Sequence, residues 1–160
     1  MKKRILIILS AVLSILVVSC ASTKVTAEQE AAVRTNIQNR NFTVNVIRAI
    51  PTGSRNVNLT SPYSIRLEGD MVYSYLPYFG RAYNIPYGGG EGLVFEAPVS
   101  DYRVVAGKKG SQTITFTAAS DAGENRFTID VYPGGSSQVT VIPAGRQAIR
   151  YDGTLDASGR

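Results

Sequence analysis

Gln112-Thr113-Ile114-Thr115-Phe116-Thr117 and Phe127-Thr128-Ile129-Asp130-Val131-Tyr132 are the two stretches of this sequence that decide its fold. Apolar and polar residues alternate in both, which is the pattern of a strand that buries one face. Asp121-Ala122-Gly123-Glu124 lies between them and carries the residue types that form tight turns. The pattern therefore predicts two strands joined by a turn.

The same pattern recurs on both sides of these stretches. Turn residues interrupt it every eight to twelve positions, and no long helical segment separates the strands, which favours an antiparallel meander over a parallel sheet. We predict a mainly β fold of about nine or ten strands, curled into a barrel-like or two-layer structure. The predicted strands are residues 41–50, 56–60, 63–68, 71–76, 93–96, 102–105, 112–117, 127–132, 139–141 and 148–151.

One helix precedes the strands. Thr26-Ala27-Glu28-Gln29 fits a capping box, and Glu30 and Arg34 have the spacing of an i,i+4 ion pair. We expect a helix over Ala27 to Asn39. Its apolar stripe is narrow, which predicts that it packs on the sheet; a partner-binding helix is the alternative.

The N-terminus has the pattern of an export signal. Lys2, Lys3 and Arg4 precede fourteen mostly apolar residues, Ile5 to Val18. A helix of that length reaches about 21 Å, less than the roughly 30 Å of bilayer hydrocarbon, which favours a signal peptide over a spanning helix.

Val17-Val18-Ser19-Cys20 ends this segment and looks like a bacterial lipobox. The resemblance implies a lipoprotein signal peptide over 1–19 and lipidation of Cys20. A secretory signal with a chance Cys is the alternative. We expect a lipidated Cys and short tether at 20–26, a single β-rich domain at 27–155, and a frayed C-terminus at 156–160.

Composition excludes several chemistries. The 160 residues include no His and one Cys, so imidazole catalysis, a His–Zn site and an internal disulfide are ruled out. Three of the 17 basic residues lie in the predicted signal peptide, which leaves 14 against 12 acidic ones. This near balance gives no case for nucleic-acid binding.

The most unusual segment is rich in tyrosine: it runs from 76 to 92, and Tyr73 and Tyr75 of the strand predicted at 71–76 are counted with it. Such a long aromatic loop suits either a plug for the open end of the sheet or a binding surface. We expect Phe79 to be an interior anchor. The residues of this plug or binding loop are Tyr73, Tyr75, Tyr78, Phe79, Arg81, Tyr83 and Tyr87.

The run SYLPYFGRAY at 74–83, the PYGG that follows, and FEAPVSDY at 95–102 carry a family resemblance. Together with the lipobox, they resemble the uncharacterised envelope lipoproteins grouped as domain of unknown function 4251. The resemblance extends over Glu28 to Thr154. It implies a cell-envelope lipoprotein of a Gram-negative bacterium, at the outer membrane or periplasmic face, and supplies no catalytic residues.

Other motifs carry little chemistry. The glycines at 88–92 lack the spacing and lysine of a phosphate-binding loop, and residues 121–125 lack the order of an EF-hand. Asp70, Glu91, Glu96 and Asp101 are the acids nearest the tyrosines, and a carboxylate pair among them could in principle hydrolyse a glycosidic bond.

We therefore predict a lipid-anchored envelope domain with a binding or structural role, and no enzyme, metal or cofactor. Its partners would be the membrane, through the anchor, and a small molecule, glycan or protein. The alternative function is a carboxylate-dependent hydrolase acting on envelope glycan.

Overall fold

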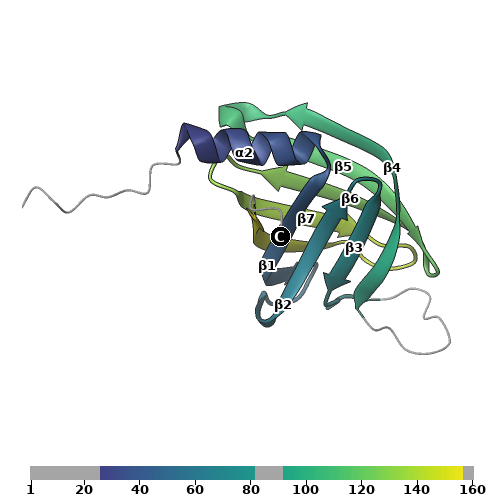
Figure 1. Cartoon of the computed structure of the whole chain (residues 1–160). Coiled ribbons are helices and arrows are strands. Elements are labelled where there is room, and N and C mark those ends of the chain that lie inside the picture. Colours follow the sequence, from purple (N-terminus) through teal and green to yellow (C-terminus); the bar gives the residue numbers. More distant parts are fainter. Residues whose placement is uncertain (1–25, 82–91, 157–160) are drawn as a thin grey trace, which may run out of the picture.

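A computed structural model describes residues 26–81 and 92–156 of the chain (Figure 1). The predicted signal peptide at 1–19, Cys20, Tyr83, Tyr87 and Glu91 lie outside the described residues.

The described residues form a closed antiparallel barrel. Each strand pairs with the next along the chain, and β8 pairs with β1 to close the sheet. The barrel-like prediction is confirmed, but the described strands number eight rather than nine or ten. They are β1 (Asn41–Pro51), β2 (Val57–Glu68), β3 (Met71–Leu76), β4 (Leu93–Ala106), β5 (Gln112–Ser120), β6 (Gly123–Val131), β7 (Ser136–Ile142) and β8 (Ile149–Asp156). Asp156, expected to fray, pairs with Thr43.

The strand count differs because two long strands each contain an irregularity. In β4 the register against β5 shifts between Ser100 and Arg103, and Asp101 has a φ of 54°. An extra residue of this kind is a β-bulge, which breaks the alternation without ending the strand. Val99 and Tyr102 therefore both pack against the core. The sequence on either side of the bulge reads as two strands.

The second irregularity lies in β2, where Ser61 and Pro62 suggested a turn. The register against β1 moves from Tyr63 opposite Val46 to Asn58 opposite Arg48, so the intervening residues of β2 bulge away. Proline is tolerated there because β3 pairs only with Ser64 to Glu68, which removes the need for a proline N–H.

Helix α2 (Ala27–Gln38) lies over one end of the barrel (Figure 1). Its predicted capping box is present, with the Thr26 hydroxyl accepting from the Gln29 backbone N–H at 3.2 Å. The predicted pair of Glu30 and Arg34 is present at 2.9 Å. Val33 and Ile37 are buried, so the helix packs on the barrel as expected.

Large side chains fill the barrel interior. Phe116 and Phe127 are fully buried and stack with their ring centroids 4.8 Å apart. An eight-stranded barrel is just wide enough for its own side chains to fill it. The largest fully buried residues are Tyr151, Phe42, Phe116, Phe127, Ile37, Ile65, Leu67, Leu76, Ile114, Ile129, Ile149 and Val44. Within the described part of the chain, no helix has the length and apolar character needed to cross a membrane.

Candidate functional site

The predicted loop residues divide between two places. Pro77 to Arg81, here called the strap, follows β3 at the end of the barrel away from α2. The Tyr151 hydroxyl donates to the carbonyl of Pro77 at 2.7 Å, and the Tyr78 hydroxyl donates to the carbonyl of Gln147 at 2.8 Å. The Gln147 backbone N–H donates to the Arg81 carbonyl at 3.0 Å. These bonds fasten the strap to β8 and to the connection between β7 and β8.

Arg146 supports the strap from the same connection. Its guanidinium donates to the Gly92 carbonyl at 3.0 Å and lies 5.2 Å from the centre of the Tyr78 ring. Burial raises the pKa of Tyr151 above its ordinary value, and the nearby Tyr78 adds to that effect. Tyr151 therefore stays protonated as a donor to the strap. Tyr78 is thus held at this end of the barrel, whereas Arg81 contributes its backbone carbonyl and keeps an exposed side chain.

Phe79 does not anchor the strap. Its side chain is 40% exposed, so the expectation of an interior anchor is wrong. Tyr78 takes that place because its hydroxyl can reach a backbone carbonyl that Phe79 has no group to bind.

Tyr73 and Tyr75 lie instead on the outer wall of the barrel. On β3 the inward positions belong to Val72, Ser74 and Leu76, so the tyrosines between them point outward. Two cross-strand rows run through them: Arg66, Tyr73 and Glu96 form one, and Ser64, Tyr75 and Val94 form the other. These six residues line an open hollow of about 360 Å³, here called the tyrosine groove.

The rings of the groove are held in place by neighbours. The guanidinium carbon of Arg66 lies 4.3 Å from the centre of the Tyr73 ring, and Arg66 also pairs with Glu68. Tyr63 stacks on Tyr75 with ring centroids 5.2 Å apart. Tyr75 nevertheless remains 48% exposed, and Val94 beside it is 53% exposed. The groove is therefore an ordered aromatic surface open to solvent.

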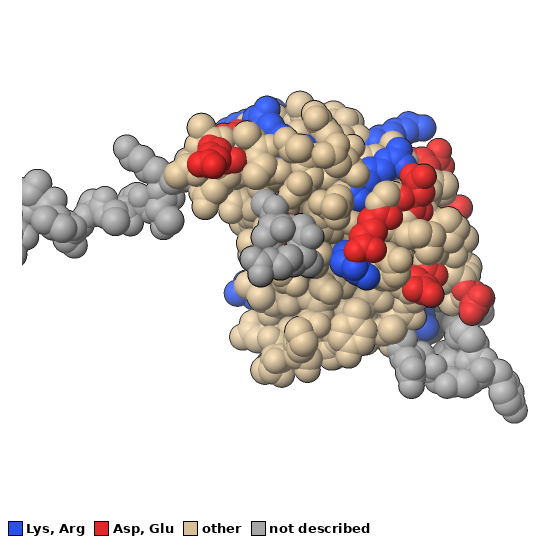
Figure 2. Space-filling view, in the orientation of Figure 1, with Lys and Arg blue, Asp and Glu red and all other residues tan. Residues whose placement is uncertain are grey.

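Charged side chains lie beside this surface. Figure 2 shows acidic and basic residues intermixed on the right of the face that carries β3 and β4, with an uncharged area over the lower ends of β1 and β2. Arg66 pairs with Glu68 on β2, and Arg40, just before β1, pairs with Asp70 in the turn from β2 to β3.

The candidate carboxylates are not gathered together. Among the described acids, Glu96 lines the groove, whereas Asp70 pairs with Arg40 near the end of α2 and Asp101 lies in the β4 bulge. Across residues 26–81 and 92–156, no three acidic or sulfur-bearing side chains lie close enough together to hold a metal ion.

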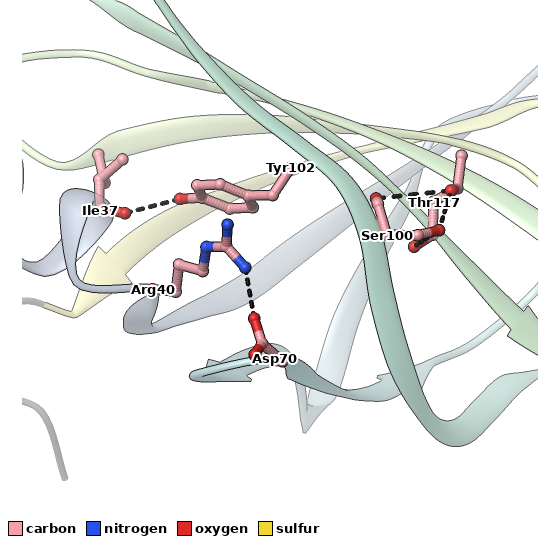
Figure 3. Close-up of polar contacts among 6 residues, drawn as sticks. All are labelled: Ile37, Arg40, Asp70, Ser100, Tyr102 and Thr117. Carbon is pink, nitrogen blue, oxygen red and sulfur yellow. Dashed lines mark hydrogen bonds and ion pairs between the residues drawn. The ribbon is translucent and has the colours of Figure 1, made fainter.

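A further cluster, which sequence reasoning missed, fastens α2 to the barrel (Figure 3). The Tyr102 hydroxyl donates to the Ile37 carbonyl at 2.6 Å, and the Arg40 guanidinium lies 4.6 Å from the ring centre while also pairing with Asp70. Burial raises the pKa of Tyr102 to about 12, although the charge of Arg40 acts to lower it. Tyr102 reaches the helix only because the bulge turns it inward, and alternation alone gives no signal of that.

The fold and its surfaces define a small closed β-barrel, with a helix over one end, a strap at the other, and a tyrosine groove on its wall. A family model described as "Domain of unknown function (DUF4251)" matches residues 24–155, and the chain belongs to this family. The resemblance inferred from the sequence is confirmed.

A solved structure supports the fold. The chain is similar to a DUF4251 family protein from Bacteroides eggerthii, with a TM-score of 0.63 and 16% identity, over 81% of this chain and 87% of the other. No match was found among curated proteins.

Proposed function

We propose that this protein is a lipid-anchored domain of the cell envelope with a non-enzymatic binding role, and that the tyrosine groove is its binding surface. The observation that carries the proposal is the pair of ordered, outward rings of Tyr73 and Tyr75 around an open hollow. Exposed aromatic rings on rigid strands offer contact area at little entropy cost, which is what a binding surface requires.

The groove combines apolar and polar contacts. Tyr75 and Val94 supply the apolar area, while the Ser64 hydroxyl and the Glu96 carboxylate supply hydrogen-bonding groups. Because Arg66 and Tyr63 already hold the two rings, a ligand would not have to order them on binding. A small molecule, a glycan or a protein segment fits this chemistry.

The strap is the weaker candidate. The hydroxyls of Tyr78 and Tyr151 are bound to backbone carbonyls, so they stabilise the closed end of the barrel. A ligand at the strap would have to break those bonds, whereas one at the groove would not.

The anchor is proposed from the sequence. Residues 20–26 span at most about 24 Å when extended, which would keep the barrel close to the membrane surface. We expect Cys20→Ser to move the protein from the membrane fraction to the soluble fraction of lysed cells. A Cys20→Ser variant that still sediments with membranes would contradict the anchor.

The groove is tested on the full-length protein, purified from membranes in detergent and applied to an array of bacterial envelope glycans and peptides. We expect the double variant Tyr73→Ala with Tyr75→Ala to bind the captured ligands with at least tenfold lower affinity than the wild type. Tyr132→Ala is the matched control, since Tyr132 is 50% exposed and lies outside the groove. Unchanged capture by the double variant would refute the groove as the binding surface.

A further inference from the structure

A second polar surface lies on the wall formed by β4 to β8, and no part of the proposed function uses it. One row of directly paired positions crosses these five strands: Arg103, Thr115, Thr128, Thr140 and Arg150. All five point outward, because the positions beside them on each strand are the ones packed in the core. We call them the Arg–Thr row.

The hydroxyls of the row are free to bind. The neighbouring Thr113 donates to the Asp130 carboxylate at 2.6 Å, and Thr117 shares a 2.6 Å hydrogen bond with Ser100. By contrast, Thr115, Thr128 and Thr140 form no side-chain hydrogen bond to another described residue. The three hydroxyls therefore stand in line, one per strand, and face solvent.

The cations of this wall are also free. Four arginines elsewhere are engaged by acids, namely Arg34, Arg40, Arg48 and Arg66. Arg103 and Arg150 at the ends of the row, and Arg126 beside it opposite Thr117, form no ion pair with any described residue.

The acids near the row form no ion pair with Arg103, Arg126 or Arg150 among the described residues. Asp152 pairs with Arg48 at 3.4 Å. Asp130 accepts from the uncharged Thr113 hydroxyl, so Asp130 keeps its negative charge beside the row. Asp101 shares a hollow with Arg103 and Arg126 but pairs with neither of them, and Glu124 lies further along β6. Three guanidinium groups that have no ion pair within residues 26–81 and 92–156 thus lie around a line of hydroxyls that have no side-chain hydrogen bond there.

We propose that the Arg–Thr row binds an acidic polysaccharide that lies across the strands. Adjacent strands are about 4.8 Å apart, so the row presents hydroxyls at that step and arginines about 19 Å apart along the wall. Guanidinium groups bind carboxylates in a two-pronged geometry, and the hydroxyls between them suit the hydroxyl and ring oxygens of sugars.

The row favours a polysaccharide over other polyanions. It crosses five of the eight strands of a closed barrel and is therefore convex, so a flat anionic membrane could not meet both ends, whereas a flexible chain can follow the curve. Single-stranded nucleic acids bind to aromatic platforms on which their bases stack, and the row contains no aromatic residue.

The test uses the full-length protein in neutral detergent and polygalacturonate, a linear chain with one carboxylate per sugar, with binding measured by calorimetry. The test variant combines Arg103→Gln, Arg126→Gln and Arg150→Gln. The control combines Arg55→Gln, Lys108→Gln and Lys109→Gln, which removes the same charge from other surfaces. Thr128→Val removes one hydroxyl while keeping the branched shape that suits a strand.

We expect the test variant to bind at least tenfold more weakly than the wild type, the control within threefold of the wild type, and Thr128→Val about threefold to tenfold more weakly. Thermal melting within a few degrees of the wild type shows that each variant is folded. Absence of binding by the wild type, or equal losses in the two charge variants, would overturn the proposal. The proposal would also be overturned if phosphatidylglycerol vesicles or single-stranded DNA displaced polygalacturonate and bound the protein more tightly than polygalacturonate does.

Discussion

Tyr102 fastens α2 to the barrel, and Tyr102→Phe removes only the hydroxyl that makes this link. The lost bond joins that hydroxyl to the Ile37 carbonyl at 2.6 Å, and a hydrogen bond of this kind contributes about 1 kcal/mol net. The Ile37 carbonyl keeps a hydrogen bond in the variant, because it also accepts from the Arg40 backbone N–H at 3.2 Å. We therefore expect a loss of about 1 kcal/mol, well below the 3 to 5 kcal/mol expected of Tyr102→Ala, which also removes the ring from Phe116 and Arg40.

The same bond gives a pH dependence with a defined sign. Burial raises the folded-state pKa of Tyr102 from 10.0 to about 12, so its contribution is complete below pH 10 and is lost as the pH rises toward 12. Two pKa units correspond to about 2.7 kcal/mol at most. Because Tyr102 is only half-buried, solvent screening reduces this, and we expect about 1 kcal/mol. The cost of Tyr102→Phe should therefore fall toward zero between pH 9 and pH 11.5.

The assay is urea unfolding of the chain beginning at Ala21, followed by circular dichroism at pH 7.5, 9 and 11.5. Tyr132→Phe serves as the control, since it removes a tyrosine hydroxyl from a side chain that is 50% exposed. A cost for Tyr102→Phe that is the same at pH 7.5 and pH 11.5 would refute the link between burial, the hydroxyl and the helix. A cost equal to that of Tyr102→Ala would show that the ring contributes nothing.

Three further predictions concern the other end and the seam of the barrel. Tyr151→Phe removes the 2.7 Å hydrogen bond to the Pro77 carbonyl. We expect it to lower the free energy of unfolding in urea by about 1 to 3 kcal/mol and to speed proteolysis within the strap, and cleavage at the wild-type rate would contradict this. Gly153→Ala would place a Cβ 2.4 Å from the Asn45 carbonyl oxygen, so we expect the free energy of unfolding to fall by about 1 to 3 kcal/mol. An unchanged melting temperature would contradict the close approach of β1 and β8. Phe79→Ala should change the unfolding free energy by no more than about 0.5 kcal/mol, and a much larger loss would show that Phe79 packs more deeply than its 40% exposure indicates.

Local patterns were enough to predict much of this fold. The capping box at Thr26, the pair of Glu30 and Arg34, and the alternation through β5 and β6 are set by neighbours within a few positions, and all are present. Closure of the barrel could be suggested only from strand number and curl, because the pairing of β1 with β8 joins residues about a hundred positions apart. No short-range pattern encodes such a contact.

The two irregular strands mark where local patterns mislead. Pro62 has the composition of a turn, and its tolerance within β2 depends on the length of β3, a neighbouring strand. The extra residue of β4 reverses which side chains point inward, so that Val99 and Tyr102 both reach the core. Neither effect can be read from the affected strand alone, which is why each strand was predicted as two.

The candidate site was predicted as one loop and is divided in the structure. Composition drew attention to the tyrosines as a group. Side chains alternate along β3, so Tyr73 and Tyr75 point outward, whereas Tyr78 follows the strand and lies across the end of the barrel. Plug and binding surface were posed as alternatives, and the described residues include features of both. The Arg–Thr row was not predicted because its members come from five strands, and only the register brings them together.

This division follows from the size of the barrel. Eight strands enclose a space that Phe116, Phe127 and their neighbours already fill, so the interior offers little room for a ligand. One end is covered by α2, fixed through Tyr102, and the strap is fixed across the other through Tyr151. The binding that we propose therefore falls to the outer wall, where a strand exposes every second side chain. The bulge at Asp101 connects the two roles of β4, since the same extra residue that turns Tyr102 inward to hold the helix turns Arg103 outward to begin the Arg–Thr row.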